Sequence, residues 1–372
     1  MSTATEARAE IPVDELEVGA YTIPTDAPEA DGTLAWDATT LVVVHAHGAG
    51  ECGLGYTYAD VSTAKLISSK LAGVVRGSDA MAPQAAWEAM VEQTRNLGRP
   101  GITSMAIAAV DVALWDLKSR ALGLPLCKLL GMARDRVPIY GSGGFTAYSN
   151  DRLAEQLSDW VEQGIPRVKM KVGSEPDRDP ERVRVARAAI GPDARLFVDA
   201  NGAYTRKQAL DLAERFADDA RVSWFEEPVS SDDLEGLRLL RDRAPAGMEI
   251  AAGEYGYDAP YFMRMLDDGA VDVLQADVTR CGGITELLRI GGLCRAHGLP
   301  LSLHCGPSIH LHPATALENF VHVEYFHDHV RIEHKLFDGV VEPVDGALTP
   351  DLNRPGMGLE LKRSEAERYA AS

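Results

Sequence analysis

The chain has 372 residues, a length that suits a barrel domain with a smaller second domain better than one ordinary core. Its 56 acidic and 37 basic residues give a formal charge of −19, which disfavours nucleic acid and anionic membranes as partners because both require clustered Lys and Arg. The composition, 45% hydrophobic and 25% charged, is typical of a soluble globular protein.

The start of the chain and its cysteines indicate the compartment. The first residues are acidic and lack the apolar core of a signal peptide. No uncharged apolar run approaches the ~18 residues that a membrane span needs. The five cysteines are scattered and do not form the pattern of a disulfide framework. We therefore expect a cytoplasmic protein without a membrane partner.

Residues 1–130 have the texture of an α+β domain. Residues 39–58, TTLVVVHAHGAGECGLGYTY, predict a strand, a turn and a Gly-rich loop, and helical patterns follow through residue 123. We expect the segment 51–62 to close over a neighbouring domain. The hydroxyls of Tyr56 and Tyr58 in that segment are candidate substrate-binding groups, with structural roles almost as good an interpretation.

Residues 131–330 carry a strand–helix repeat. Eight short apolar or β-branched runs occur, and amphipathic stretches that Asp or Thr often opens lie between them, although the last unit has only a short helix candidate. This repeat predicts a (β/α)8-type barrel. The segment 331–372 is rich in Gly and Pro, too irregular to extend the barrel, and we expect it to return to the capping domain.

The predicted barrel strands end in ionisable residues. Because such strands deliver functional groups at their C-terminal ends, these side chains should gather at one mouth of the barrel. Seven consecutive strands contribute Lys169 and Lys171, Asp199, Glu226, Glu254, Asp277, His304 and Glu324. Any one of them could be a surface charge, but one at every strand predicts a site.

Three of these carboxylates come from adjacent strands and predict a metal centre. Asp199, Glu226 and Glu254 would repel one another unless a divalent cation joined them. A set of oxygen ligands suits Mg²⁺ better than Zn²⁺. Glu227 follows Glu226 directly and so points away; we expect it to support the ligands rather than to bind.

Several motifs together identify a family. They are AIAAVDVALWDLKSRALGLPLCKLLG from residue 106, VKMKV from 168, VDAN from 198, FEEP from 225, AGE from 252, DVTRCGG from 277 and LSLHC from 301. On these motifs nearly the whole chain resembles the enolase superfamily, in particular its mandelate racemase subgroup. The resemblance implies that the predicted carboxylate triad binds Mg²⁺, which the substrate carboxylate chelates.

The resemblance also implies roles for the other residues at the mouth. Lys171 is one acid/base, and Lys169 beside it should lower the pKa of Lys171 by like-charge repulsion and contact the substrate carboxylate. Asp277 orients the second base, His304. Two further roles complete the site: Glu324 as a carboxylic acid that hydrogen-bonds the enolate oxygen, and Asn201 as a substrate contact.

These roles favour a Mg²⁺-dependent lyase that dehydrates an acid sugar to a 2-keto-3-deoxy acid. A racemase or epimerase of a 2-hydroxy acid would use the same residues, and a non-catalytic binding protein is a remote alternative because no ligand or base is missing. The resemblance further implies a homo-oligomer, a dimer or a multiple of it. We interpret the histidines of HLH (310–312) and HDH (327–329) as solvated loop residues, not zinc ligands. Asp111 and Asp116 are interpreted as packing or interdomain residues.

Overall fold

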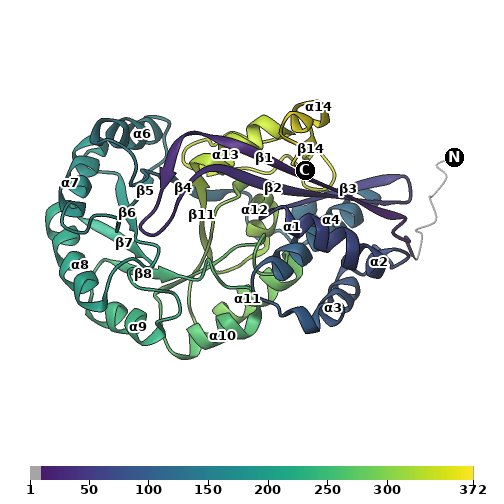
Figure 1. Cartoon of the computed structure of the whole chain (residues 1–372), viewed down its shortest axis with the longest axis horizontal. Coiled ribbons are helices and arrows are strands. Elements are labelled where there is room, and N and C mark those ends of the chain that lie inside the picture. Colours follow the sequence, from purple (N-terminus) through teal and green to yellow (C-terminus); the bar gives the residue numbers. More distant parts are fainter. Residues whose placement is uncertain (1–9, 372) are drawn as a thin grey trace.

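The computed structural model describes residues 10–371, which form a barrel with a smaller domain against it (Figure 1). The smaller domain, which we call the cap, begins with an antiparallel sheet in the order β1–β2–β3. Its strands are β1 (Glu15–Ala30), β2 (Ala35–Gly48) and β3 (Glu51–Tyr58). Its helices are α1 (Ser62–Leu66), η1 (Ile67–Leu71), α2 (Ala72–Val75), α3 (Pro83–Gln93), η2 (Arg95–Leu97), α4 (Ile102–Ala121) and α5 (Leu126–Leu129).

The predicted (β/α)8 barrel is confirmed. Eight parallel strands run in chain order, and the barrel closes where β11 pairs with β4. The strands are β4 (Val137–Gly143), β5 (Arg167–Lys171), β6 (Arg195–Asp199), β7 (Val222–Glu226), β8 (Glu249–Ala252), β9 (Val273–Ala276), β10 (Leu301–Leu303) and β11 (Phe320–Phe326). The helices are α6 (Asn150–Glu162), α7 (Asp179–Ile190), α8 (Arg206–Ala220), α9 (Leu234–Arg243), α10 (Ala259–Asp267), α11 (Ile284–Ala296), α12 (Pro307–Ala316) and α13 (His327–Leu336). Within residues 10–371, no helix is long and apolar enough to cross a membrane.

Side chains that cap the backbone explain where several barrel helices begin. The Thr205 hydroxyl accepts from the Gln208 backbone N–H while the Gln208 side chain accepts from the Thr205 N–H, a capping box at the start of α8. Asp258 accepts from the Tyr261 N–H at the start of α10. These are the helix-start signals read from the sequence.

Strand periodicity divides the barrel interior into layers. In β6, Phe197 and Asp199 lie two residues apart on one face, as do Trp224 and Glu226 in β7. The Phe197 and Trp224 rings stack with centroids 5.3 Å apart, and Tyr140 packs on Phe197. An aromatic layer therefore fills the barrel beneath the carboxylates, so the site has a solid floor.

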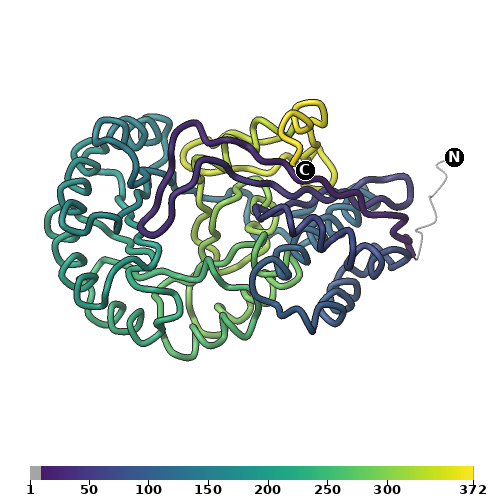
Figure 2. The backbone as a smooth tube through the Cα atoms, in the orientation of Figure 1, coloured from purple at the N-terminus to yellow at the C-terminus, as the bar shows by residue number. Residues whose placement is uncertain are grey.

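The cap sheet is held against helix α4 by two glycines in β3. A Cβ at Gly53 would lie 2.2 Å from the Ala113 carbonyl oxygen, and one at Gly55 would lie 2.1 Å from that of Ala109. Only glycine permits this close approach of strand and helix. The long hairpin β1–β2 then reaches from this base across the barrel (Figure 2).

The C-terminal segment returns to the cap, as predicted. Its elements are β12 (Phe337–Asp338), β13 (Ala347–Leu348), β14 (Glu360–Leu361), α14 (Arg363–Ala366) and η3 (Glu367–Tyr369). The Met357 N–H donates to Asp116 on α4 (2.6 Å), and the Ala371 N–H donates to the Ala20 carbonyl in β1 (2.8 Å). The C-terminal segment thus bonds to both helix α4 and strand β1 of the cap.

Candidate active site

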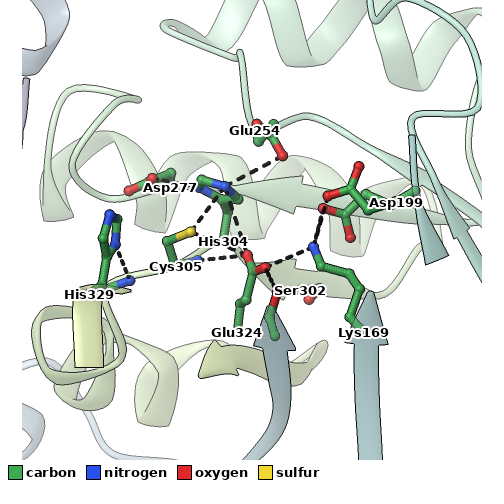
Figure 3. Close-up of polar contacts among 12 residues, drawn as sticks. Lys169, Asp199, Glu254, Asp277, Ser302, His304, Cys305, Glu324 and His329 are labelled. Atoms are coloured by element: carbon green, nitrogen blue, oxygen red, sulfur yellow. Dashed lines mark hydrogen bonds and ion pairs between the residues drawn. The ribbon is translucent and has the colours of Figure 1, made fainter. Parts of the chain in front are cut away.

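The ionisable residues predicted at the barrel mouth lie close together, and Figure 3 labels six of them, among them Lys169, His304 and Glu324. Each lies within two residues of the C-terminal end of its strand, the nearest being Lys171, Asp199 and Glu226, which are the last residues of β5, β6 and β7. All are buried: Lys169, Lys171, Asp199, Glu226, Glu254, Asp277, His304 and Glu324. Charged groups are buried together only when they pair or bind ligands, so this cluster is the candidate active site.

The three predicted metal ligands converge. One ligand oxygen each from Asp199, Glu226 and Glu254 lies within 4.8 Å of the others. Glu254 Oε2 is buried and accepts no hydrogen bond from the described residues. Burial and the neighbouring Asp199 raise the pKa of Glu226, although Lys169 opposes this. Clustered oxygens, one without a partner, fit a hard divalent cation such as Mg²⁺.

Both lysines of the K-x-K motif point into this cluster from β5. Lys169 pairs with Glu226 and lies 3.2 Å from Asp199 and 2.8 Å from Glu324. Lys171 donates to Asp199 at 2.5 Å and to Asn201 Oδ1 at 3.1 Å. The strand alternation read from the sequence therefore places both cations on the inner face.

The expected pKa of Lys171 needs a correction. Burial lowers this pKa and so does repulsion from Lys169, as anticipated, but Asp199, Glu254 and Glu324 together outweigh these effects and the net shift is upward. The sequence shows that Lys169 is a like charge beside Lys171, but it does not show that Lys171 contacts Asp199. A divalent cation held by the triad would compete for the Asp199 charge and so weaken the effect of Asp199 on the pKa of Lys171.

His304 and Asp277 form the predicted dyad. His304 Nδ1 lies 2.9 Å from Asp277 Oδ2, which leaves Nε2 facing the carboxylates, 3.4 Å from Glu254 and 3.8 Å from Glu324. Burial raises the pKa of Asp277, but the hydrogen bond to His304 and nearby positive groups hold it well below its usual range. Asp277 therefore remains ionised and fixes the orientation of the imidazole.

Glu324 is an anion in this arrangement, whereas the sequence predicted a carboxylic acid. Its Oε1 accepts from the Ser142 hydroxyl at 2.5 Å, and its Oε2 accepts from the Cys305 backbone N–H at 3.1 Å. Burial raises the pKa of Glu324, but Lys169 and other positive groups hold it well below its usual range. The contact with Lys169 is the physical reason for the difference.

A cavity of about 410 Å³ lies over this cluster, between barrel and cap. From the barrel it is lined by Lys171, Asn201, Glu254 and His304. From the cap it is lined by residues of the β1–β2 hairpin and by Tyr58 at the end of β3. A molecule bound in this cavity would therefore contact both predicted bases and Glu254 of the carboxylate triad.

The structure separates the two tyrosines that the sequence treated alike. Tyr58 lines the cavity and its ring stacks on His329 with centroids 3.4 Å apart. Tyr56 is fully buried, does not line the cavity, and donates its hydroxyl to Glu333 at 2.7 Å. Tyr56 is therefore a packing residue between cap and barrel, and the expected substrate contact is wrong for it. The segment around them is mostly strand β3, not a loop.

Sequence reasoning missed two parts of the cavity wall. Arg280, in the DVTRCGG motif, lies 3.4 Å from Glu254 Oε1 and 3.8 Å from Asp277 Oδ2. The second part is the hairpin tip, where Leu34 and Trp36 line the cavity. Arg280 could have been found from the sequence, because it is the one cationic residue of the DVTRCGG motif. The hairpin gave no comparable signal.

The histidines of HLH and HDH are not solvated loop residues, contrary to expectation. His310 and His312 are buried in α12, and His310 Nε2 accepts from the Val278 N–H at 2.8 Å. His329 is buried in α13 beside Tyr58. Burial lowers the pKa of His312 to about 4, and burial together with the nearby His304 and Arg280 lowers that of His329 to about 3.

The fold and the site define an enolase-type barrel enzyme, and sequence comparison agrees. Residues 152–366 match the enolase C-terminal domain-like family, and residues 24–131 match the mandelate racemase / muconate lactonizing enzyme N-terminal domain. The chain therefore belongs to the mandelate racemase / muconate lactonizing enzyme family of the enolase superfamily.

Individual relatives cover nearly the whole chain. A mandelate racemase/muconate lactonizing enzyme-like protein from Rubrobacter xylanophilus is 60% identical, with a TM-score of 0.95 over 97% of this chain and 100% of that one. D-galactarolactone cycloisomerase of Agrobacterium fabrum is 30% identical over 92% of this chain and 95% of its own length. L-talarate dehydratase from Polaromonas, crystallised with Mg and L-glucarate, is 29% identical with a TM-score of 0.87 over 97% and 98%. Other relatives are acid sugar dehydratases and an epimerase, so an enzyme of this superfamily is supported.

Proposed function

We propose that the protein is a Mg²⁺-dependent acid sugar dehydratase. It would remove the proton α to the carboxylate and eliminate the β-hydroxyl as water, giving a 2-keto-3-deoxy acid. The substrates named for several relatives are acid sugars, which supports this class. They include both mono- and dicarboxylic acids, so membership of the family leaves the substrate open.

One observation carries the proposal. Lys171 and His304 both line the cavity, but they come from β5 and β10, strands that β4 and β11 separate around the barrel. A substrate between them would present its α-carbon to one base and its β-hydroxyl to the other. The Asp277 contact leaves His304 Nε2 as the nitrogen directed at the cavity.

The chemistry follows from these positions. When bound, Mg²⁺ would hold the substrate carboxylate and offset the negative charge that develops on it. Asp199, Glu226 and Glu254 are the residues that would hold the ion. Contacts to such a developing charge are worth ~3–4 kcal/mol each, and we assign one of them to Lys169, which pairs with Glu226 of the triad.

The proton transfers balance between the two bases. Neutral Lys171 accepts the α-proton as the C–H bond breaks. His304, as imidazolium, donates a proton to the β-hydroxyl as the C–O bond breaks, and water leaves. The remaining enol then takes up a proton at carbon and releases the proton of its hydroxyl, which gives the keto acid.

A racemase or epimerase is the second candidate, because two bases on different strands could remove a proton on one face and return it on the other. An epimerase among the relatives favours keeping it. α-Deuterium exchange without loss of water would identify it.

The test is a panel of acid sugars assayed for keto-acid formation. We expect at least one to yield a 2-keto-3-deoxy acid, with turnover abolished by EDTA and restored by Mg²⁺. Turnover that resists the chelator would overturn the carboxylate-triad assignment. Exchange without elimination across the panel would replace the lyase by the isomerase.

A further inference from the structure

The part of the cap that covers the barrel mouth carries no cationic side chain that could bind an anion. Between residues 10 and 64, which include all of β1, β2 and β3, the sequence contains no Lys or Arg but many Asp and Glu. Figure 2 shows this hairpin reaching across the barrel. Two of these acidic residues, Asp31 at the hairpin tip and Asp60 just after β3, line the cavity.

The hairpin tip is seated closely on the barrel. A Cβ at Gly32 would lie 2.5 Å from the Ala200 carbonyl oxygen and 2.7 Å from that of Val172. The Thr146 N–H, in the loop after β4, donates to the Ala30 carbonyl at 2.8 Å. The acidic wall is therefore fixed over the ends of β5 and β6, and the far end of a bound substrate meets it.

The cations that do line the cavity are engaged at its catalytic end. Among the described lining residues, Lys171 and Arg280 are the only Lys or Arg. Lys171 donates to Asp199 at 2.5 Å, and Arg280 donates to the Glu254 carbonyl at 3.2 Å. His329 is not a substitute, because burial beside positive groups lowers its pKa to about 3 and keeps it neutral.

The cap wall offers acceptors and an aromatic surface instead. Asp31 accepts from the Leu34 N–H through Oδ1, and Asp60 accepts from the Ser62 N–H through Oδ1. The Oδ2 atom of each can therefore accept from a sugar hydroxyl. The Trp36 indole N–H donates to Glu29 at 2.8 Å, and its ring lines the cavity. Such a wall suits hydroxyls and C–H groups, and a carboxylate placed there would face like charge without a partner.

We propose that the preferred substrates are monocarboxylic acid sugars, whose far end is an uncharged hydroxyl or methyl group, and that dicarboxylic acid sugars are rejected by the cap. This inference rests on the proposed dehydration of acid sugars and names the substrate class of the same site.

The first test compares matched acids that differ only at the far end. The Mg²⁺-loaded enzyme is assayed with six-carbon aldonates and the corresponding aldarates. We expect kcat/KM for the best aldonate to exceed that for the best aldarate by about 100-fold, as unpaired buried charge rejects a substrate. A preference for aldarates would overturn this inference while leaving the proposed function standing. Turnover of neither class would overturn both.

The second test adds the missing cation. Leu34 lines the cavity at the hairpin tip and is 65% exposed, so it tolerates a longer side chain. We expect Leu34→Arg to raise the ratio of aldarate to aldonate kcat/KM by about tenfold, and the neutral variant Leu34→Gln to leave this ratio within about twofold of wild type. Equal ratios in the two variants would contradict the charge argument.

Discussion

Three residues at the barrel mouth hold backbone conformations that residues other than glycine rarely adopt. Asn201, Glu227 and Cys305 have φ of 45°, 38° and 52°. Such conformations cost on the order of 1–3 kcal/mol each and persist where surrounding contacts impose them. Here the contacts belong to the site: Asn201 accepts from Lys171, and the Cys305 N–H donates to Glu324. Part of the folding free energy therefore offsets the strain of these conformations, which orient the groups of the site.

The adjacent pair Glu226 and Glu227 offers a matched test of the metal centre. Both are buried, but only Glu226 joins the cluster with Asp199 and Glu254. We predict that Glu226→Gln weakens Mg²⁺ binding by about 100-fold or more, since even residues behind the ligands contribute 10–100-fold. Glu227→Gln should weaken it at least about tenfold less than Glu226→Gln does. Calorimetric titration with Mg²⁺ measures both, and circular dichroism checks the fold. Equal losses would count against the triad.

Strand periodicity was sufficient to predict most of the charged residues at the mouth. It could not separate Tyr56 from Tyr58, because two residues two apart in a strand share a face and only the position of the cap decides which one reaches the cavity. Nor could it show that Glu324 contacts Lys169, a contact between β11 and β5. Such contacts depend on how strands far apart in the sequence meet.

Among the secondary-structure elements, the β1–β2 hairpin was the one that the sequence did not predict. β1 carries polar residues on both faces and two prolines, features that disfavour a strand assignment. It forms because β2 supplies a partner along most of its length, from Glu15 opposite His47 to Pro24 opposite Ala38, and again at Glu29 and Ala30 after a shift in register. The barrel strands were visible because each is short, apolar and followed by an amphipathic helix. The hairpin's position over the mouth is a tertiary property.

Helix α4 is joined to the barrel by a buried carboxylate. Asp111 accepts from the Thr285 N–H at 2.9 Å and from its hydroxyl at 2.6 Å, at the start of α11. We predict that Asp111→Ala lowers the free energy of unfolding by about 1–3 kcal/mol, because it leaves the Thr285 N–H without an acceptor. Asp111→Asn, which keeps an acceptor oxygen, should lose less. Urea unfolding of the three proteins measures this, and a larger loss in the Asn variant would contradict it.

A second buried carboxylate, Glu29 in β1, predicts a dependence of stability on pH. Burial and the nearby Asp328 and Asp26 raise its pKa to about 8, although Trp36 and Arg331 oppose this. The folded state therefore retains a proton that the unfolded chain releases above its ordinary carboxyl pKa. Stability should fall as pH rises from about 4.5 to 8, by up to roughly 1.4 kcal/mol per pH unit from this group.

Glu29→Gln isolates this effect. We predict that the variant gains stability relative to wild type between pH 5 and pH 8.5, as measured by urea unfolding across that range. Glu15→Gln, an exposed site on the same strand, is the control and should show no such trend. A constant difference between Glu29→Gln and wild type would exclude a raised pKa at Glu29.

At the scale of the molecule, the cap and the C-terminal segment act on the barrel together. Asp116 on α4 accepts from Leu54 in β3 and from Met357 in the tail, and Arg363 in the tail pairs with Glu17 in β1. We propose that residues 10–130 and 331–371 form one covering unit on the barrel of residues 131–330. Substrate selection would then belong to the unit, and proton transfer to the barrel.

The central claim is that Lys171 and His304 are two separate bases in one cavity. It is tested most directly by NMR of acid sugar epimers incubated in D₂O with Lys171→Ala, His304→Asn and the double variant. We predict that His304→Asn blocks elimination yet still exchanges the α-proton of epimers whose hydrogen faces Lys171. Lys171→Ala should also block elimination, yet still exchange the α-proton of the opposite epimers, whose hydrogen faces His304. The double variant should exchange the α-proton of neither set of epimers. Loss of all exchange in both single variants, with the fold and Mg²⁺ binding intact, or exchange that survives in the double variant, would contradict this account.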